Sequence, residues 1–154
     1  VATPEHRYNM LCQAMDHARM SVSRIELDRG GYSYTVDTLQ ELKQVYPADT
    51  ELYFVVGGDT LKDIVNWREP EKVVKLCTFI AYPRENVDIA QAQICAARIE
   101  AMGGSVLLSQ SQCPTISSTE IRERAAMGLS LAGYVPPDVE SYIRAHDVYG
   151  GPDA

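Results

Sequence analysis

Apolar and polar residues follow two different patterns along the chain. Short continuous apolar runs are typical of strands buried in a parallel sheet, whereas spacings of three and four residues indicate amphipathic helices. The runs predict strands over residues 51–56, 77–82 and 105–108, and a weaker alternation predicts another over residues 20–27. The spacings predict helices over residues 3–16, from 38 to about 46, from 59 or 60 onward, and over 70–76, 88–102, 118–127 and from 136 onward.

This succession of strands and helices predicts an α/β protein with a parallel sheet and helices on both faces. At 154 residues the chain is expected to form a single domain over residues 1–154. The apolar stripe of each helix predicts the side that faces the core. In the helix ending near residue 46 the stripe is Leu39, Leu42 and Val45, and over residues 88–102 it is Ile89, Ile94, Ile99 and Met102.

Composition and charge limit the classes of molecule that the protein could bind. The formal net charge is −7, which disfavours a protein that grips a nucleic-acid polymer but allows a local site for a small anion. Four cysteines lie far apart without a CxxC pair, which argues against a zinc knuckle or disulfide scaffold and suits a reducing cytosol. No apolar run approaches the roughly 20 residues that span a bilayer, and no signal peptide is visible. We therefore expect a cytoplasmic protein without a membrane partner.

The segment Ile116–Arg122 carries the strongest candidate for anion binding. Ser117 and Glu120 have the spacing of a capping box, which predicts the start of a helix. Unpaired N–H groups and the positive end of the helix dipole favour an anion at such a start. The hydroxyls and the guanidinium of this segment would add to that site: Ser117, Ser118, Thr119 and Arg122. An ordinary capped surface helix is the alternative.

Three further stretches leave two interpretations each. Asp59 follows an apolar run and Gly57-Gly58, so its carboxylate could accept hydrogen bonds from a ribose or simply cap a helix. Trp67, the only tryptophan, could stack on a flat ring or fill the core. Ser33 and Thr35 could cap the helix that follows, or their backbone could face a ligand.

Several common catalytic patterns are missing from the sequence. His6, His17 and His146 have no metal-binding spacing and no HExxH motif occurs, so no protein-bound metal is expected. There is also no nucleophile elbow and no Walker-type phosphate loop. The candidate chemistry therefore rests on backbone amides, hydroxyls and arginines.

Four segments together resemble the bacterial nicotinate-nucleotide adenylyltransferase family of the nucleotidyltransferase superfamily. They are Ser33-Tyr34-Thr35-Val36-Asp37-Thr38-Leu39, Val56-Gly57-Gly58-Asp59 followed by Trp67, Ile116-Ser117-Ser118-Thr119-Glu120-Ile121-Arg122, and Tyr134-Val135-Pro136 with Tyr142-Ile143. The segment Ile116–Arg122 by itself is shared with related adenylyltransferases. Its combination with the segment Ser33–Leu39 and the lone tryptophan is much more specific. The resemblance implies a Rossmann-like fold and takes in nearly the whole chain.

The resemblance also implies a reaction and a set of residue roles. Nicotinate mononucleotide would attack the α-phosphate of Mg·ATP to give deamido-NAD and pyrophosphate, in the biosynthesis of NAD. Trp67 would stack on the nicotinate ring, and backbone N–H groups of Thr35 and Arg68 would hold its carboxylate. Gly57 and Asp59 would lie at the adenosine ribose. The ATP phosphates would be bound by Ser117, Ser118, Thr119 and Arg122.

One part of the family pattern is not found in the 154 residues. The family begins with a strand, a Gly-rich turn and an HxGH motif, whereas His6 lies in Pro-Glu-His-Arg. We expect that the chain is N-terminally incomplete and that the catalytic histidines lie outside it. There are three alternatives. The chain could be a non-catalytic nucleotide-binding module, another chain could supply the missing segment, or the protein could be a sister adenylyltransferase with a different phosphate acceptor. The resemblance leaves a homo-oligomeric state open.

Overall fold

The computed structural model describes residues 2–15, 19–82, 89–109, 111 and 116–150. The chain divides into two compact units, one made of residues 30–115 and the other of residues 1–29 with 116–154. Because each unit has its own apolar core, each is described by itself. The prediction of a single domain remains a prediction.

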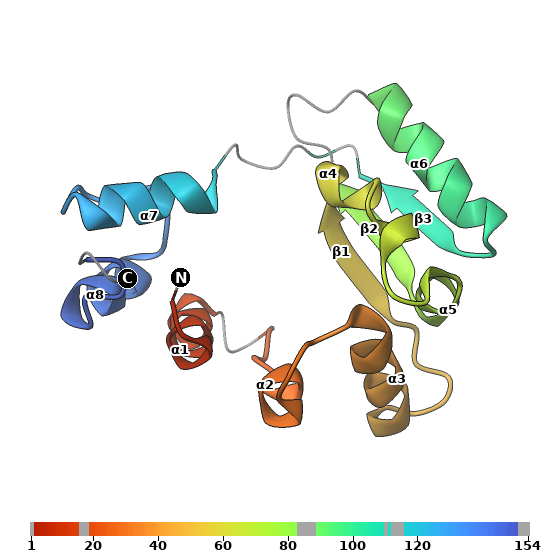
Figure 1. The fold of residues 1–154 in the computed structure, drawn as a ribbon, viewed down its shortest axis with the longest axis horizontal. Helices are drawn as coiled ribbons and strands as arrows, with labels where there is room; N and C mark the ends of the chain where they lie inside the picture. Colours follow the sequence, from red (N-terminus) through yellow and green to blue (C-terminus); the bar gives the residue numbers. More distant parts are fainter. Residues whose placement is uncertain (1, 16–18, 83–88, 110, 112–115, 151–154) are drawn as a thin grey trace. The chain divides into compact units, whose positions relative to one another are not determined.

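The unit of residues 30–115 contains a parallel sheet in the order β1-β2-β3 (Figure 1). Its strands are β1 (Tyr53–Gly57), β2 (Thr78–Tyr82) and β3 (Ser105–Leu108). The register aligns Val55 with Ile80 and Ile80 with Leu107. All three strands were predicted from continuous apolar runs, and their positions are confirmed to within two residues.

Helices form every connection between these strands. β1 leads to β2 through α4 (Gly58–Leu61), the 3-10 helix η1 (Ile64–Asn66) and α5 (Pro70–Leu76). α6 (Ile89–Ala101) leads to β3 and runs alongside it, and α3 (Thr35–Val45) precedes the sheet (Figure 1). Connections between neighbouring parallel strands are right-handed. Because β1, β2 and β3 follow one another across the sheet in chain order, their connecting helices lie on the same face. The predicted class, a parallel sheet flanked by helices, is confirmed.

The apolar core of this unit lies on that helix-covered face. Alternate residues of the strands point to it, including Val56, Phe79 and Ala81. Fully burying an aliphatic or aromatic side chain stabilises a fold by about 1.5–3 kcal/mol. The opposite face carries Val55 and Leu107, which are 63% and 53% exposed, so β1 is not covered on both faces as its continuous apolar run predicted. The largest fully buried side chains of the unit are Phe79, Leu61, Ile64, Ile99, Val36, Val73 and Val74.

Two predicted helix faces are corrected by the structure. Val45 at the end of α3 is 69% exposed, whereas the predicted Leu39 is buried, together with Val36. In α6, Ile89 and Ile94 are exposed. Small side chains beside Ile99 let α6 pack closely against β3 and α4. The residues that α6 buries are Ala92, Cys95, Ala96 and Ile99.

The prediction of a strand over residues 20–27 is wrong. A short helix, α2 (Ile25–Arg29), occupies the end of this stretch. Local bonds favour the helical turn, because the Ser23 hydroxyl accepts from the N–H of Ile25 and the Arg24 guanidinium donates to Asp28 four residues later. Apolar residues here do not keep a strict period of two, so one sheet face would not have been apolar.

The second unit is built from helices. α1 (Pro4–Ala14) packs against α8 (Pro137–Ala145), and α7 (Ser118–Ala126) completes the group (Figure 1). Thr3 caps α1 by accepting from the N–H of His6 at 3.3 Å, and Pro4 occupies the first turn as predicted. No helix among the described residues is long and apolar enough to cross a membrane. The core of this unit contains Ala2, Leu131, Val139, Ile143 and Val148.

Candidate functional site

The carboxyl end of β1 presents Asp59 to solvent. Gly57 is the N-cap of α4 and Asp59 lies inside the first turn, so of the two interpretations of Asp59 the helix cap is not observed. Its Oδ1 accepts from the N–H of Thr60 at 3.1 Å, and the residue is exposed. Ligands of parallel α/β sheets bind at the carboxyl ends of the strands. The position therefore suits a carboxylate that meets a ligand.

Thr35 and Arg68 come from separate parts of the unit but have a common neighbour. The Arg68 guanidinium carbon lies 4.5 Å from the centre of the Tyr34 ring, a cation–π contact. Tyr34 is the N-cap of α3 and Thr35 is its first residue. No side chain caps this helix, so capping by Ser33 or Thr35 is not observed. The first-turn N–H of Thr35 therefore starts a helix next to an arginine.

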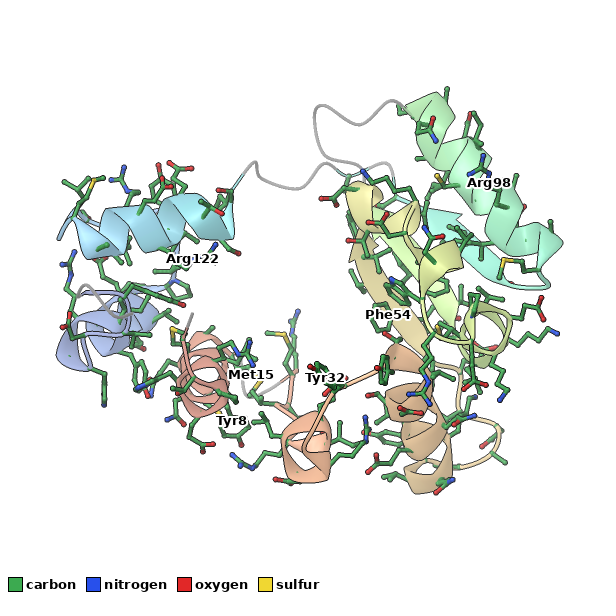
Figure 2. All side chains as sticks on the ribbon, viewed as in Figure 1. Tyr8, Met15, Tyr32, Phe54, Arg98 and Arg122 are labelled. Carbon is green, nitrogen blue, oxygen red and sulfur yellow. The ribbon has the colours of Figure 1, made fainter. Side chains whose placement is uncertain are left out.

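Trp67 lies between η1 and α5, in the loop where the sequence placed it. Its ring meets Phe54 of β1 at 5.9 Å and Phe79 of β2 at 6.3 Å between ring centres, both in edge-to-face geometry. The tryptophan is partly buried. Phe54 is labelled in Figure 2 on the same sheet face as Phe79. Trp67 thus packs on the core while part of its surface stays accessible, which combines features of both interpretations.

The start of α7 has the cap that the sequence predicted. Ser117 is the N-cap, and its Oγ accepts from the N–H of Glu120 at 3.0 Å. Arg122, labelled in Figure 2, donates from Nη2 to Thr119 Oγ1 at 3.1 Å, so a guanidinium and a hydroxyl lie together beside the first turn. Ser117, Ser118 and Thr119 are exposed. Ser118 and Arg122 also border a groove of about 560 Å³, to which α1 contributes Arg7.

Glu120 does not complete the capping box that its spacing predicted. Its carboxylate accepts from the Tyr134 hydroxyl at 2.7 Å, which raises the pKa of Tyr134. The Arg124 guanidinium lies 4.7 Å from the centre of the Tyr134 ring and also donates to the carbonyl of Ser130. Sequence analysis missed this contact because the two partners are fourteen residues apart, a spacing without a local signal.

The histidines meet other side chains rather than a metal cluster. His6 Nδ1 lies 3.0 Å from the Tyr142 hydroxyl, and the His146 ring stacks on Tyr142 with centres 4.1 Å apart. Over the described ranges, no group of three or more His, Cys, Asp or Glu residues could hold a metal ion. His17 lies outside the described residues.

The predicted site residues fall into the two units. Five of them belong to residues 30–115, where they lie at the start of α3, at the end of β1 and start of α4, and in the loop before α5: Thr35, Gly57, Asp59, Trp67 and Arg68. The remaining residues belong to the helical unit, at the start of α7: Ser117, Ser118, Thr119 and Arg122.

Comparison with known proteins shows the family to which the chain belongs. A family model of cytidylyltransferase-like proteins matches residues 1–124. A probable nicotinate-nucleotide adenylyltransferase of Thermoanaerobacter sp. is 36% identical over 97% of this chain and 72% of its own length. The corresponding protein of Thermus thermophilus is 38% identical over 97% of this chain and 75% of its own length.

Solved structures share the fold. Plasmodium falciparum nicotinic acid mononucleotide adenylyltransferase complexed with NaAD matches with a TM-score of 0.73 at 22% identity, over 94% of this chain and 73% of that one. A second structure of that enzyme, complexed with APC, matches with a TM-score of 0.72 over 95% of this chain and 75% of that one. The chain belongs to the nicotinate-nucleotide adenylyltransferases, within the cytidylyltransferase-like family.

Proposed function

We propose that the protein transfers the adenylyl group of Mg·ATP to nicotinate mononucleotide, forming deamido-NAD and pyrophosphate. The observation that carries the proposal is the 36–38% identity to named nicotinate-nucleotide adenylyltransferases over 97% of the chain. The phosphate oxygen of the mononucleotide attacks the α-phosphorus of ATP. The bond from that phosphorus to the bridging oxygen breaks, and the electron pair leaves with pyrophosphate.

On the mononucleotide side, we assign Trp67 to the nicotinate ring and the N–H groups of Thr35 and Arg68 to its carboxylate. The accessible part of the Trp67 ring and its support by Phe54 and Phe79 suit a stacking platform. The cation–π contact between Arg68 and Tyr34 holds the arginine near the start of α3. A helix start beside a guanidinium favours a carboxylate.

On the ATP side, Gly57 and Asp59 are assigned to the ribose and the start of α7 to the phosphates. Hydroxyls at Ser117, Ser118 and Thr119, together with Arg122, can donate to phosphate oxygens. Such a site needs no covalent intermediate, because it aligns two anions and neutralises the charge that develops on the leaving pyrophosphate. The residues present are of the types that this chemistry needs.

A divalent ion is expected to arrive with the nucleotide. Mg²⁺ binds through substrate phosphates with one or two carboxylates rather than a dedicated protein cage. The ion would supply charge neutralisation on the phosphates. The free thiols of Cys12, Cys77 and Cys95 support the cytoplasmic location expected for this reaction.

The proposal is tested by following pyrophosphate release from Mg·ATP and nicotinate mononucleotide. The 154-residue chain is compared with a form carrying the N-terminal extension that the family resemblance implies. Release by the extended form that requires both substrates supports the proposal. Saturable ATP binding without release by the extended form would instead favour a non-catalytic module. Release with another phosphate acceptor but not with nicotinate mononucleotide would favour a sister enzyme.

A further inference from the structure

The start of α7 has an unusual arrangement of its acidic residue. In a complete capping box, the side chain at the third helical position reaches back to the N–H of the N-cap residue. Glu120 holds that position and Ser117 is the N-cap, but among the described residues only the bond from the Glu120 N–H to Ser117 Oγ is made. The Glu120 carboxylate accepts from the Tyr134 hydroxyl at 2.7 Å instead.

This arrangement changes the electrostatics of the helix start. A carboxylate that folded back onto Ser117 would occupy an N-terminal N–H group and place a negative charge at the positive end of the helix dipole. An incoming phosphate would then compete with the Glu120 carboxylate for that N–H group and for the positive potential of the helix start. While Tyr134 holds the carboxylate, it does not compete with an anion for an N–H group or for the positive potential of the helix start.

Tyr134 is itself held in place by α7 and the segment before α8. The Arg124 guanidinium lies over its ring, and the same guanidinium donates through Nε and Nη2 to the Ser130 carbonyl at 3.1 and 2.9 Å. Glu120 and Tyr134 are both partly buried. The tyrosine hydroxyl is therefore a fixed donor, which limits the return of the carboxylate to the cap.

We propose that Tyr134 is a positioning residue that keeps the Glu120 carboxylate away from the phosphate-binding start of α7. The inference rests on the proposed function, because it assigns a role relative to the ATP phosphates. It predicts that loss of the Tyr134 hydroxyl weakens phosphate binding only while residue 120 carries a carboxylate.

The test measures the affinity of the chain for inorganic pyrophosphate and for Mg·ATP by calorimetry. Tyr134→Phe is expected to weaken pyrophosphate binding about three- to tenfold, the range of a helix-terminus charge interaction. In the Tyr134→Phe/Glu120→Gln double variant the affinity is expected to recover to that of Glu120→Gln alone. Rescue by the second substitution is a result that simple loss of packing around Tyr134 would not give.

A matched control is available at another tyrosine. Tyr53 donates to Glu51 at 2.9 Å, the same kind of bond in the unit of residues 30–115, so Tyr53→Phe is expected to leave the pyrophosphate affinity unchanged. Wild-type affinity in Tyr134→Phe overturns the inference, and so does equal weakening in the single and double variants. A separate variant tests the proposed phosphate site itself. If the start of α7 does not bind phosphate, Arg122→Ala will leave the pyrophosphate affinity unchanged.

Discussion

At the scale of single residues, Trp67 packs in the core and is proposed to stack on the nicotinate ring, and ordinary mutagenesis would confuse these two roles. Its ring packs edge-to-face on Phe54 and Phe79, yet part of its surface is accessible. Removing the ring therefore disturbs the core and any ligand that stacks on it. A substitution that keeps an aromatic ring separates the two effects better than alanine does.

We expect Trp67→Phe to raise the KM for nicotinate mononucleotide several-fold more than the KM for ATP, because a smaller ring offers less stacking surface. Loss of base–aromatic stacking altogether costs about 1–3 kcal/mol. Trp67→Ala should in addition lower the free energy of unfolding by roughly 2–4 kcal/mol, as truncation of a packed aromatic residue does. Steady-state kinetics and urea unfolding provide the two measurements. Equal changes in both KM values would argue for a different phosphate acceptor.

Cys77 is expected to make stability depend on alkaline pH. The thiol is 8% exposed, and burial raises its pKa from 9.0 to about 11. The folded state therefore disfavours the thiolate, and the stability that this group contributes is complete below pH 9 and is lost as the pH rises to about 11. Across this window the free energy of unfolding should fall by up to about 1.4 kcal/mol per pH unit through this group.

Urea unfolding at several pH values measures this dependence. The alkaline slope should be smaller in Cys77→Ala and Cys77→Ser, since neither replacement titrates in this window. A slope that stays unchanged in both variants would assign the alkaline loss of stability to other groups.

At the scale of elements, the sequence predicted those whose signal is local. Continuous apolar runs located β1, β2 and β3, and proline and glycine located the start of α5 and the end of α6. The stretch over residues 20–27 was misjudged because its weak alternation competed with local side-chain bonds. The buried side of α6 was predicted only in part, at Ile99, because the rest of it is formed by alanine and cysteine, whose small side chains give a weaker apolar pattern.

The end of α6 offers a steric prediction. Gly103 has a positive φ of 83°, and the N–H of Gly104 donates to the Ile99 carbonyl at 3.1 Å, which ends the helix. A Cβ at Gly104 would lie 2.7 Å from Val74 Cβ and 3.0 Å from the Val74 carbonyl oxygen. Gly104→Ala should therefore force α5 and α6 apart and destabilise the protein by about 1–3 kcal/mol.

Thermal and urea unfolding measure this effect, and Gly30→Ala is a useful control. At Gly30 the φ of 68° is strained for alanine, but a Cβ would meet nothing within 4 Å. That substitution should cost about 1 kcal/mol, as expected for backbone strain alone. A smaller loss at Gly104 than at Gly30 would show that α5 and α6 adjust without cost.

At the scale of the whole molecule, the net charge of −7 opposes an anionic substrate. Affinity for a nucleotide must then come from local groups at helix starts and from arginines. The chain's motifs indicated which residues these are, and the structure adds their local contacts, such as that between Arg122 and Thr119. The contact between Glu120 and Tyr134 could not be predicted, because it depends on how a loop folds back onto α7.

Nucleotide binding should raise the stability of the whole chain. At a concentration of ATP one hundred times its Kd, the free energy of unfolding should rise by about 2.7 kcal/mol. Arg122→Ala should weaken ATP binding by about 1.5–3 kcal/mol and so remove about half or more of this stabilisation at the same concentration.

Thermal unfolding with and without ATP checks this, and Arg98→Ala is the matched control. Arg98, labelled in Figure 2, is exposed on α6 in the unit of residues 30–115, so its removal changes the net charge equally and leaves the residues of α7 unaltered. Equal loss of stabilisation in the two variants would attribute the effect to overall charge.

The single tryptophan has a practical consequence for spectroscopy. Light absorbed at the red edge of the aromatic band excites only one fluorophore, and that fluorophore lies in the unit of residues 30–115 beside Phe54 and Arg68. A ring that stacks on its accessible part would quench its emission. Emission titrations can therefore follow the nicotinate half of the substrate pair without any added label.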